Sequence, residues 1–168
     1  KIALFRQGIK MDIAIKLGVP AVVFVIIGAS ITTFLPTHQI ELGMHIILVL
    51  LAIYLILHFN KSVKQTDANL YAGGIASGFI AGIAGTGGAI RGITLSAFQL
   101  PKEVFIATSA LIDLGVDFSR AVVYVGNGYF KKEYLFLIPF LIVISIVGSY
   151  IGKKILERTS EIVFRTIV

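Results

Sequence analysis

Long apolar segments alternate with short polar ones along the whole chain. Each apolar run approaches the roughly 20 residues that an α-helix needs to cross a bilayer. The stretches between them are polar or charged, as expected for loops at a membrane surface. The pattern therefore predicts an all-α, polytopic integral membrane protein built as a helical bundle. The expected spans are 13–35, 42–59, 68 to a break near 85, 104–125 and 134–156, and a sixth begins at 162.

Two prolines, Pro20 and Pro139, lie inside expected spans. Proline removes one backbone donor, which kinks a helix or is compensated by neighbouring helices in a membrane. We do not expect either residue to end its helix.

The glycine-rich segment 73–92, GGIASGFIAGIAGTGGAIRG, is the most informative part of the chain. Gly74, Gly78 and Gly82 recur at every fourth position, a spacing typical of two membrane helices in close contact. We interpret these three as packing glycines. The residues that follow are different, because packing needs neither a doubled glycine nor a threonine between glycines.

A break in the helix is expected at 85–88. Irregular backbone at membrane depth is tolerated only where it is buried in protein or lines a cavity. A helix that restarts after the break would present unpaired N–H groups and the positive end of its dipole, which suits an anion. Arg91 lies in the first turn of that helix, and the alternative for it is snorkelling to a headgroup. The candidate substrate-binding residues here are Gly85, Thr86, Gly87, Gly88 and Arg91.

The fourth span carries a polar stripe. At 100° per residue its members fall on one helix face. They are Ser109, Asp113, Asp117, Arg120 and Tyr124. Ionisable groups are expensive at this depth, so the face should point to the bundle interior or to water. Two carboxylates at i, i+4 disfavour joint ionisation, so Asp113 or Asp117 could carry a coupling proton. The alternative is a set of internal ion pairs, Asp117 with Arg120 or Asp113 with Arg91.

Composition agrees with a membrane protein. Hydrophobic residues make up 57% of the 168-residue chain, charged residues only 14%, and the mean hydropathy is +0.93. A soluble domain of this length would need far more charge on its surface. The net charge of +6 comes from Lys and Arg in short segments between apolar runs, which fits membrane topology better than nucleic-acid binding. We therefore expect the lipid bilayer as a partner and no nucleic acid.

The sequence shows no signature of a metal, cofactor or catalytic site. The chain has no cysteine, which excludes thiolate metal sites and disulfides. His38, His45 and His58 lack the spacing of a metal site, and no histidine lies near the depth of Ser109 and Asp113. We expect no cofactor, no metal and no enzymatic activity. The sequence does not indicate an oligomeric state.

An offset of 120 positions aligns two parts of the chain. The matched pairs are Gly8 with Gly128, Gly28 with Gly148 and Glu41 with Glu161. This order of turn, kinked apolar span and mid-span glycine is typical of internally duplicated transporters. We predict one transmembrane domain in which 1–67 ends a first repeat and 68–168 forms a second, truncated at its C-terminus. The chain is then expected to be a fragment of a longer protein.

The placement of basic residues favours a re-entrant glycine segment, since cytoplasmic loops carry the excess of Lys and Arg. If 73–92 dips in and returns, the basic segment 152–158 lies on the same side as Lys61 and Lys64. A full crossing would put it on the opposite side. Re-entrance also makes the two repeats antiparallel, so we predict an inverted internal repeat. Lys131 and Lys132 disagree with this arrangement.

These motifs resemble the TauE/SafE family of sulfite and organosulfonate exporters. GFIAGIAGTGGAIRG resembles the family's glycine signature, and LPKEVFIATSALID resembles its linker leading to a Thr-Ser pair. The resemblance implies a two-repeat transporter that exports small sulfur-containing anions across a bacterial inner membrane. It assigns the signature to Gly78, Gly82, Gly85, Gly87 and Gly88, and the pair to Thr108 and Ser109. The chain departs from the pattern at Ala89, where members often have a third glycine.

The leading hypothesis is therefore a secondary anion transporter. The break and Arg91 would bind the anion, Thr108 and Ser109 would donate hydrogen bonds, and Asp113 or Asp117 would carry the proton. Arg120 completes the candidate substrate-binding residues. The alternative is a non-transporting membrane scaffold whose glycines and charges serve helix packing. An enzyme acting on lipid-soluble substrates is a more distant third.

Overall fold

The structure is a computed structural model that describes residues 8–58, 64–130, 132–161 and 163–164. Across these ranges the regular secondary structure is all helical, with no β-strand. The α-helices are α1 Met11–Ile31, α2 Thr37–His58, α3 Asp67–Ala84, α4 Gly88–Ser96, α5 Lys102–Gly126 and α6 Leu137–Arg158. Two short 3-10 turns, Thr32–Phe34 and Lys132–Tyr134, follow α1 and precede α6.

The expected spans correspond to α1, α2, α3, α5 and α6, which confirms the all-helical prediction. Among the described residues, two helical stretches, Met11–Phe34 and Leu137–Arg158, are long and apolar enough to cross a membrane. A shorter apolar stretch, His38–Leu50, lies within α2. The sixth expected span, which begins at 162, falls almost entirely outside the described residues.

The two prolines differ in their placement. Pro20 lies in the interior of α1, which continues past it to Ile31 as expected. Pro139 lies in the first turn of α6, which begins at Leu137 and continues past it to Arg158 as expected. A first-turn N–H has no partner within the helix, so proline there removes no bond.

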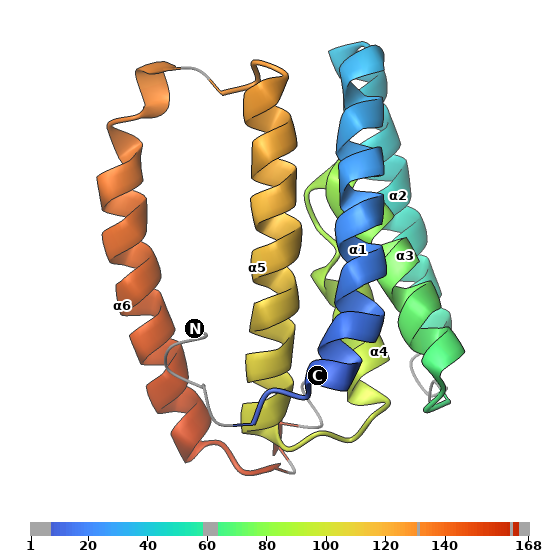
Figure 1. The fold of residues 1–168 in the computed structure, drawn as a ribbon, viewed down its shortest axis with the longest axis vertical. Helices are drawn as coiled ribbons and strands as arrows, with labels where there is room; N and C mark the ends of the chain where they lie inside the picture. Colours follow the sequence, from blue (N-terminus) through green and yellow to red (C-terminus); the bar gives the residue numbers. More distant parts are fainter. Residues whose placement is uncertain (1–7, 59–63, 131, 162, 165–168) are drawn as a thin grey trace.

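The centre of the fold is the contact between α1 and α3, with α5 packed against α1 (Figure 1). A methyl group on any of three α3 glycines would collide with a carbonyl oxygen of α1. The pairs are Gly74 with Leu17, Gly78 with Ala21 and Gly82 with Val25. The predicted packing role of these glycines is therefore confirmed, and α1 is the partner helix.

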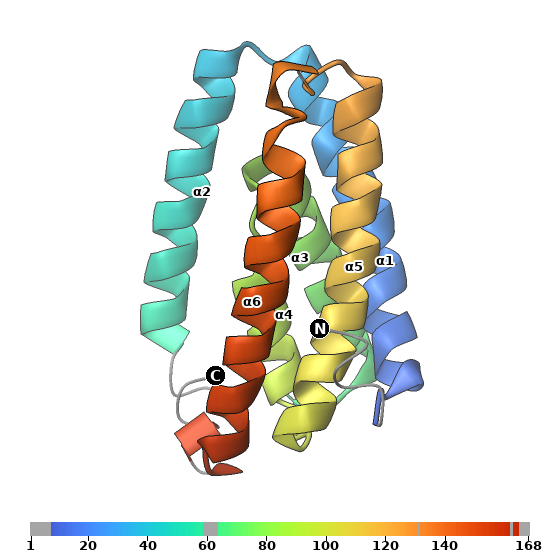
Figure 2. The ribbon, with the colours of Figure 1, turned by 90° about the vertical axis from the view of Figure 1, so that its left-hand side faces the viewer.

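The helices α2 and α6 stand at the edges of the bundle (Figures 1 and 2). α6 exposes almost every side chain and buries Leu156. It is attached at its C-terminal end, where Lys102 Nζ donates to Leu156 O at 3.1 Å and to Thr159 O at 2.6 Å. Phe105 and Phe164 meet edge to face nearby, with ring centroids 5.5 Å apart. The start of α5 therefore holds the end of α6.

Candidate functional site

The glycine-rich segment breaks as predicted. α3 ends at Ala84, and Gly85 takes the left-handed conformation with φ 73°. Its N–H donates to Ala81 O at 3.0 Å, which closes the last turn of α3. The chain then passes through Thr86 and Gly87 into α4.

After the break the chain reverses direction. Gly87 lies against the backbone of Ser77, and a methyl on Gly73 would collide with the Thr94 side chain near the end of α4. Because Thr94 follows Gly87 while Gly73 precedes Ser77, α4 runs back along α3. Figure 2 shows α4 next to α3 in the lower half of the bundle. The broken segment is thus a helical hairpin with its tip at 85–87.

The tip of this hairpin is accessible. Gly85, Thr86 and Gly88 are exposed, whereas Gly87 is buried against α3. The first N–H groups of any α-helix lack intrahelical partners, and the N-cap Gly87 offers no side chain to satisfy them. The start of α4 therefore presents free N–H donors and the positive end of its dipole at an open position.

Arg91 is buried directly behind this helix start. Only 6% of the residue is exposed, and its Nη2 forms an ion pair with Asp113 Oδ1 on α5. Its Nε and Nη1 are buried and have no hydrogen-bond partner in the part of the chain that the structure describes. Arg91 lies in the first turn of α4, where its backbone N–H donates to Gly87 O at 3.2 Å. A buried guanidinium with unused donors is unusual, because unmet buried donors are costly.

Asp113, the partner of this buried arginine, lies partly at the surface. Its side chain is 37% exposed, and Ser109 Oγ donates to Asp113 Oδ2 at 3.5 Å. Of the two ion pairs left open by the sequence, Arg91 with Asp113 therefore forms between α4 and α5. The carboxylate is partly exposed at the surface of the chain, while its partner is buried.

The second ion pair also forms, on α5 itself. Arg120 Nη2 donates to Asp117 Oδ1 at 3.0 Å, and the Asp117 side chain is 61% exposed. Arg120 Nη1 donates to Ala81 O at 3.2 Å. One turn further along α5, Tyr124 OH donates to Gly82 O at 2.9 Å.

Arg120 and Tyr124 thus donate to carbonyl groups in the last turn of α3. Ala81 O also accepts the Gly85 N–H, so Arg120 is its second donor. A cation beside the last carbonyls of a helix also complements the helix dipole. Through Ala81 O, Arg120 contacts the α3 arm of the hairpin close to its tip. Tyr124 belongs to the predicted polar stripe but was not among the candidate site residues. Its partner is a backbone oxygen of another helix, which leaves no mark in the sequence.

Thr108 is separated from the rest of the candidate residues. It is fully buried, and its Oγ1 accepts a hydrogen bond from Lys10 N at 3.2 Å. It therefore faces the start of α1, whereas the adjacent Ser109 contacts Asp113. The structure brings together Ser109, Asp113 and Arg91, and it places Asp117 and Arg120 beside the end of α3.

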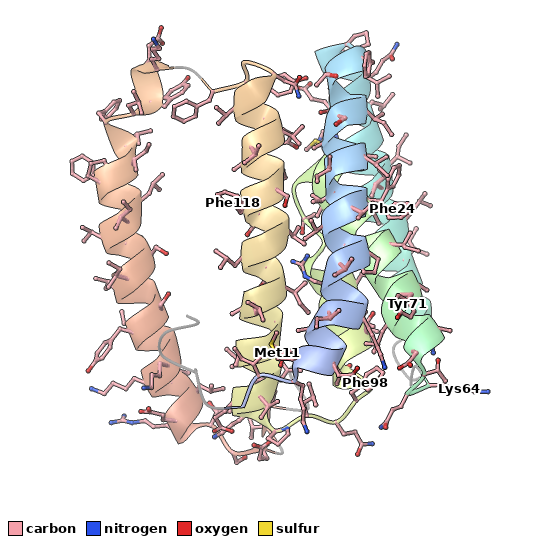
Figure 3. The ribbon with its side chains drawn as sticks, viewed as in Figure 1. Met11, Phe24, Lys64, Tyr71, Phe98 and Phe118 are labelled. Carbon is pink, nitrogen blue, oxygen red and sulfur yellow. The ribbon has the colours of Figure 1, made fainter. Side chains whose placement is uncertain are left out.

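A groove of about 280 Å³ lies between α1 and α5, with Met11 at the α1 end shown in Figure 3. Glycines and apolar side chains line it. They are Met11, Ala14, Ile15, Gly18, Val19, Val22, Val23, Leu111, Ile112 and Gly115. Its lining residues have no polar side chain, so it does not resemble an anion site. Within the described residues there is also no cluster of three His, Cys, Asp or Glu side chains that could hold a metal ion.

A comparison with known protein families identifies the family of this chain. The model of the family described as "Sulfite exporter TauE/SafE" matches residues 2–168. The chain belongs to the TauE/SafE family. The resemblance seen in the glycine signature and the Thr-Ser linker is therefore confirmed.

A relative of this chain is named as a membrane transporter. The chain is 25% identical over 176 residues to the probable membrane transporter protein YdhB of Bacillus subtilis (strain 168). The alignment covers 98% of this chain and 71% of the relative. No solved structure matches the chain. TauE/SafE proteins are membrane transporters, and this chain is a membrane transporter of that family.

Proposed function

We propose that this chain exports a small sulfur-containing anion, such as sulfite or an organosulfonate, as a multi-pass protein of a bacterial inner membrane. The family description names sulfite, and the family places the chain in a membrane. The observation that carries the proposal is the buried Arg91 with two unused donors behind the open start of α4. Both features attract an anion, and they converge at one break in the fold.

Four groups take part in this proposal. The first N–H groups of α4, beginning at Gly88, and the free donors of Arg91 bind the anion. Ser109 adds a hydroxyl close to the pair that Arg91 forms with Asp113. Asp113 is the better candidate than Asp117 for the coupling proton, because it touches Arg91 directly.

The hairpin of α3 and α4 fits a re-entrant segment. α4 has nine residues, about half the length of a membrane span, and it returns along α3 toward the level at which α3 begins. Irregular backbone at the tip then lies part-way through the membrane, where transporter folds place substrate sites. In this arrangement α5 begins on the same side of the membrane as α3 and crosses the whole membrane.

An inverted repeat is supported by matching turns. Gly8 precedes α1 with φ 121°, and Gly128, its partner at the offset of 120, precedes α6 with φ 74°. Positive φ favours glycine, so the same requirement recurs at both positions. The Gly28 and Gly148 positions differ, because Gly28 packs tightly on α3 and a methyl on Gly148 would meet no atom within 4 Å.

The scaffold alternative is favoured by two observations. The glycines of α3 do pack against α1, and both predicted ion pairs form. It gives no reason, however, for an exposed hairpin tip or for unused donors on a buried arginine. A scaffold function would also not require a break in the helix.

Flux into proteoliposomes tests the proposal. The purified chain is reconstituted, and uptake of sulfite, methanesulfonate, sulfate and chloride is measured with Arg91→Gln beside it. The matched control is Arg158→Gln, which removes one cation at the exposed end of α6. We expect anion flux in the wild type and in the control and little in Arg91→Gln. Wild-type liposomes that carry no anion faster than empty ones would refute the proposed function.

A further inference from the structure

Arg120 contacts the hairpin tip from the side of α5. Its Nη1 donates to Ala81 O in the last turn of α3 at 3.2 Å. A methyl group on Gly85, the left-handed residue that ends α3, would lie 3.6 Å from the same nitrogen. Its Nη2 donates to Asp117 Oδ1, one turn earlier on α5, at 3.0 Å. The guanidinium is therefore anchored on α5 through one nitrogen and reaches the break in α3 through the other.

The carbonyl of Ala81 does not need this donor. It already accepts the N–H of Gly85 at 3.0 Å, so it would stay bonded without Arg120. The Asp117 side chain is 61% exposed, so this ion pair is not part of the buried interior of the chain. The contact therefore satisfies no acceptor of α3 that would otherwise be unmet. Its consequence is geometric, because it fixes the end of α3 relative to α5.

Two tyrosines make the same kind of contact beyond Arg120. Tyr124 OH donates to Gly82 O on α3 at 2.9 Å, and Tyr129 OH donates to Thr32 O, just after α1, at 3.1 Å. Their rings meet edge to face with centroids 5.7 Å apart. Side chains of α5 and of the turn after it thus reach the ends of both α1 and α3. Arg120 is the member of this set that also lies beside the turn of the hairpin.

The position of this turn affects the proposed anion donors. α4 begins at Gly88, three residues after Gly85, and carries both the open N–H groups and Arg91. Arg91 is itself attached to α5 through Asp113. An anion can bind both sets of donors only if the hairpin tip and the Arg91 guanidinium are held at a fixed separation. Arg120 fixes the tip on α5, the same helix that holds Arg91.

We infer that Arg120 is a positioning residue for the anion and not one of its ligands. This rests on the proposed anion site at Arg91. Asp117 orients the guanidinium of Arg120, and Arg120 places the end of α3 so that the start of α4 and the free donors of Arg91 face the same anion. Arg120 and Asp117 take these roles in place of those predicted from the sequence, substrate ligand and proton carrier.

Removing Asp117 separates positioning from direct binding. If Arg120 bound the anion itself, Asp117→Ala would free its Nη2, remove a competing negative charge and strengthen binding. If Arg120 positions the tip, the same change leaves its guanidinium unanchored and weakens binding. We expect the affinity of the purified chain for methanesulfonate, measured by titration calorimetry, to fall about threefold or more in Asp117→Ala. Glu157→Ala, which removes an exposed carboxylate of α6, is the matched control.

Hydrogen exchange reports the position of the tip without any anion. Exchange of peptides covering 81–91 is measured by mass spectrometry in the wild type, in Asp117→Ala and in Arg120→Met, which keeps a long side chain without its donors. We expect exchange there to be about tenfold faster in both variants, because opening of the turn is less restrained, and unchanged in α6. Arg158→Met, at the exposed end of α6, is the control. A ligand role for Arg120 predicts no change in the absence of an anion.

The outcomes distinguish this inference from the proposed function. Equal or tighter binding of methanesulfonate in Asp117→Ala than in the wild type overturns the positioning role and leaves the anion site standing. Exchange at 81–91 at the wild-type rate in both variants does the same. No binding to the wild type removes the proposed function and this inference with it. If Arg120→Met does not fold, Asp117→Ala, which changes an exposed residue, still decides.

Discussion

Arg91 of α4 and Asp113 of α5 form an ion pair in which the arginine is buried and the carboxylate is partly exposed. The pair joins the returning arm of the hairpin to the helix beside it. It leaves Nε and Nη1 of the arginine without a partner among the described residues. A pair built only for stability would use those donors, so we interpret the arrangement as a site prepared for an anion.

The shape of the guanidinium should matter as well as its charge. Lysine has the same charge but lacks the planar fork, so it cannot hold Asp113 and an oxyanion at the same time with fixed geometry. We predict that Arg91→Lys folds and lowers methanesulfonate flux by about tenfold, which corresponds to about 1.4 kcal/mol. Flux at the wild-type rate would show that charge alone suffices.

Close packing of α1 on α3 depends on Gly78. A methyl there meets the backbone of Ala21, which cannot move aside as a side-chain end would. We predict that Gly78→Ala lowers the free energy of unfolding by about 1–3 kcal/mol, the usual cost of overpacking. Chemical unfolding in detergent measures it.

Gly148→Ala is the control for that substitution. Gly148 also lies in a helix, but a methyl on it meets no atom within 4 Å. Alanine favours helix over glycine by up to about 1 kcal/mol, so this variant should be neutral or slightly stabilising. Equal destabilisation of the two variants would contradict the packing described for α1 and α3.

Much of this fold follows from the sequence, and the reasons are local. The spacing of Gly74, Gly78 and Gly82 predicts a close helix contact, and the doubled glycine at 87 and 88 predicts the break. Both signals lie within a few residues of their consequence. The identity of α1 as the partner of α3 depends on contacts between distant segments, which no local pattern records.

The site was predicted less completely. The sequence offered two ion pairs as the alternative to a functional role, Asp113 with Arg91 and Asp117 with Arg120, and both form. The structure pairs Asp113 with Arg91 and adds the carbonyl oxygen of Ala81 as a partner of Arg120. Every residue has a carbonyl, so composition cannot indicate which one accepts a bond. Thr108 lies beside Ser109 in sequence and yet faces Lys10, because adjacent helical residues point about 100° apart.

The left-handed Gly85 fixes where α3 ends. A residue with a Cβ atom in that conformation costs roughly 1–2 kcal/mol, and asparagine tolerates it better than alanine. We predict that Gly85→Ala lowers both the unfolding midpoint and anion flux, and that Gly85→Asn retains more of each. Thermal unfolding and flux on the same preparations measure this. An alanine variant as stable and active as the asparagine variant would contradict the assigned role of the turn.

The hydrogen bond from Tyr124 to Gly82 O should hold the hairpin in position. Tyr124→Phe removes the donor and leaves a partly buried carbonyl unsatisfied, at a cost of about 1–3 kcal/mol. We predict lower stability and a lower maximal flux with a smaller effect on KM, because Tyr124 does not contact the proposed anion. Tyr150→Phe, at an exposed position on α6, is the control. A change confined to KM would instead place the hydroxyl at the anion.

Binding of methanesulfonate to the purified chain, measured by titration calorimetry, tests the central claim most directly. The account predicts saturable binding to the wild type and to Arg158→Gln, and affinity weakened by about tenfold or more in Arg91→Gln. Equal affinity in all three proteins would contradict an anion site at the break between α3 and α4.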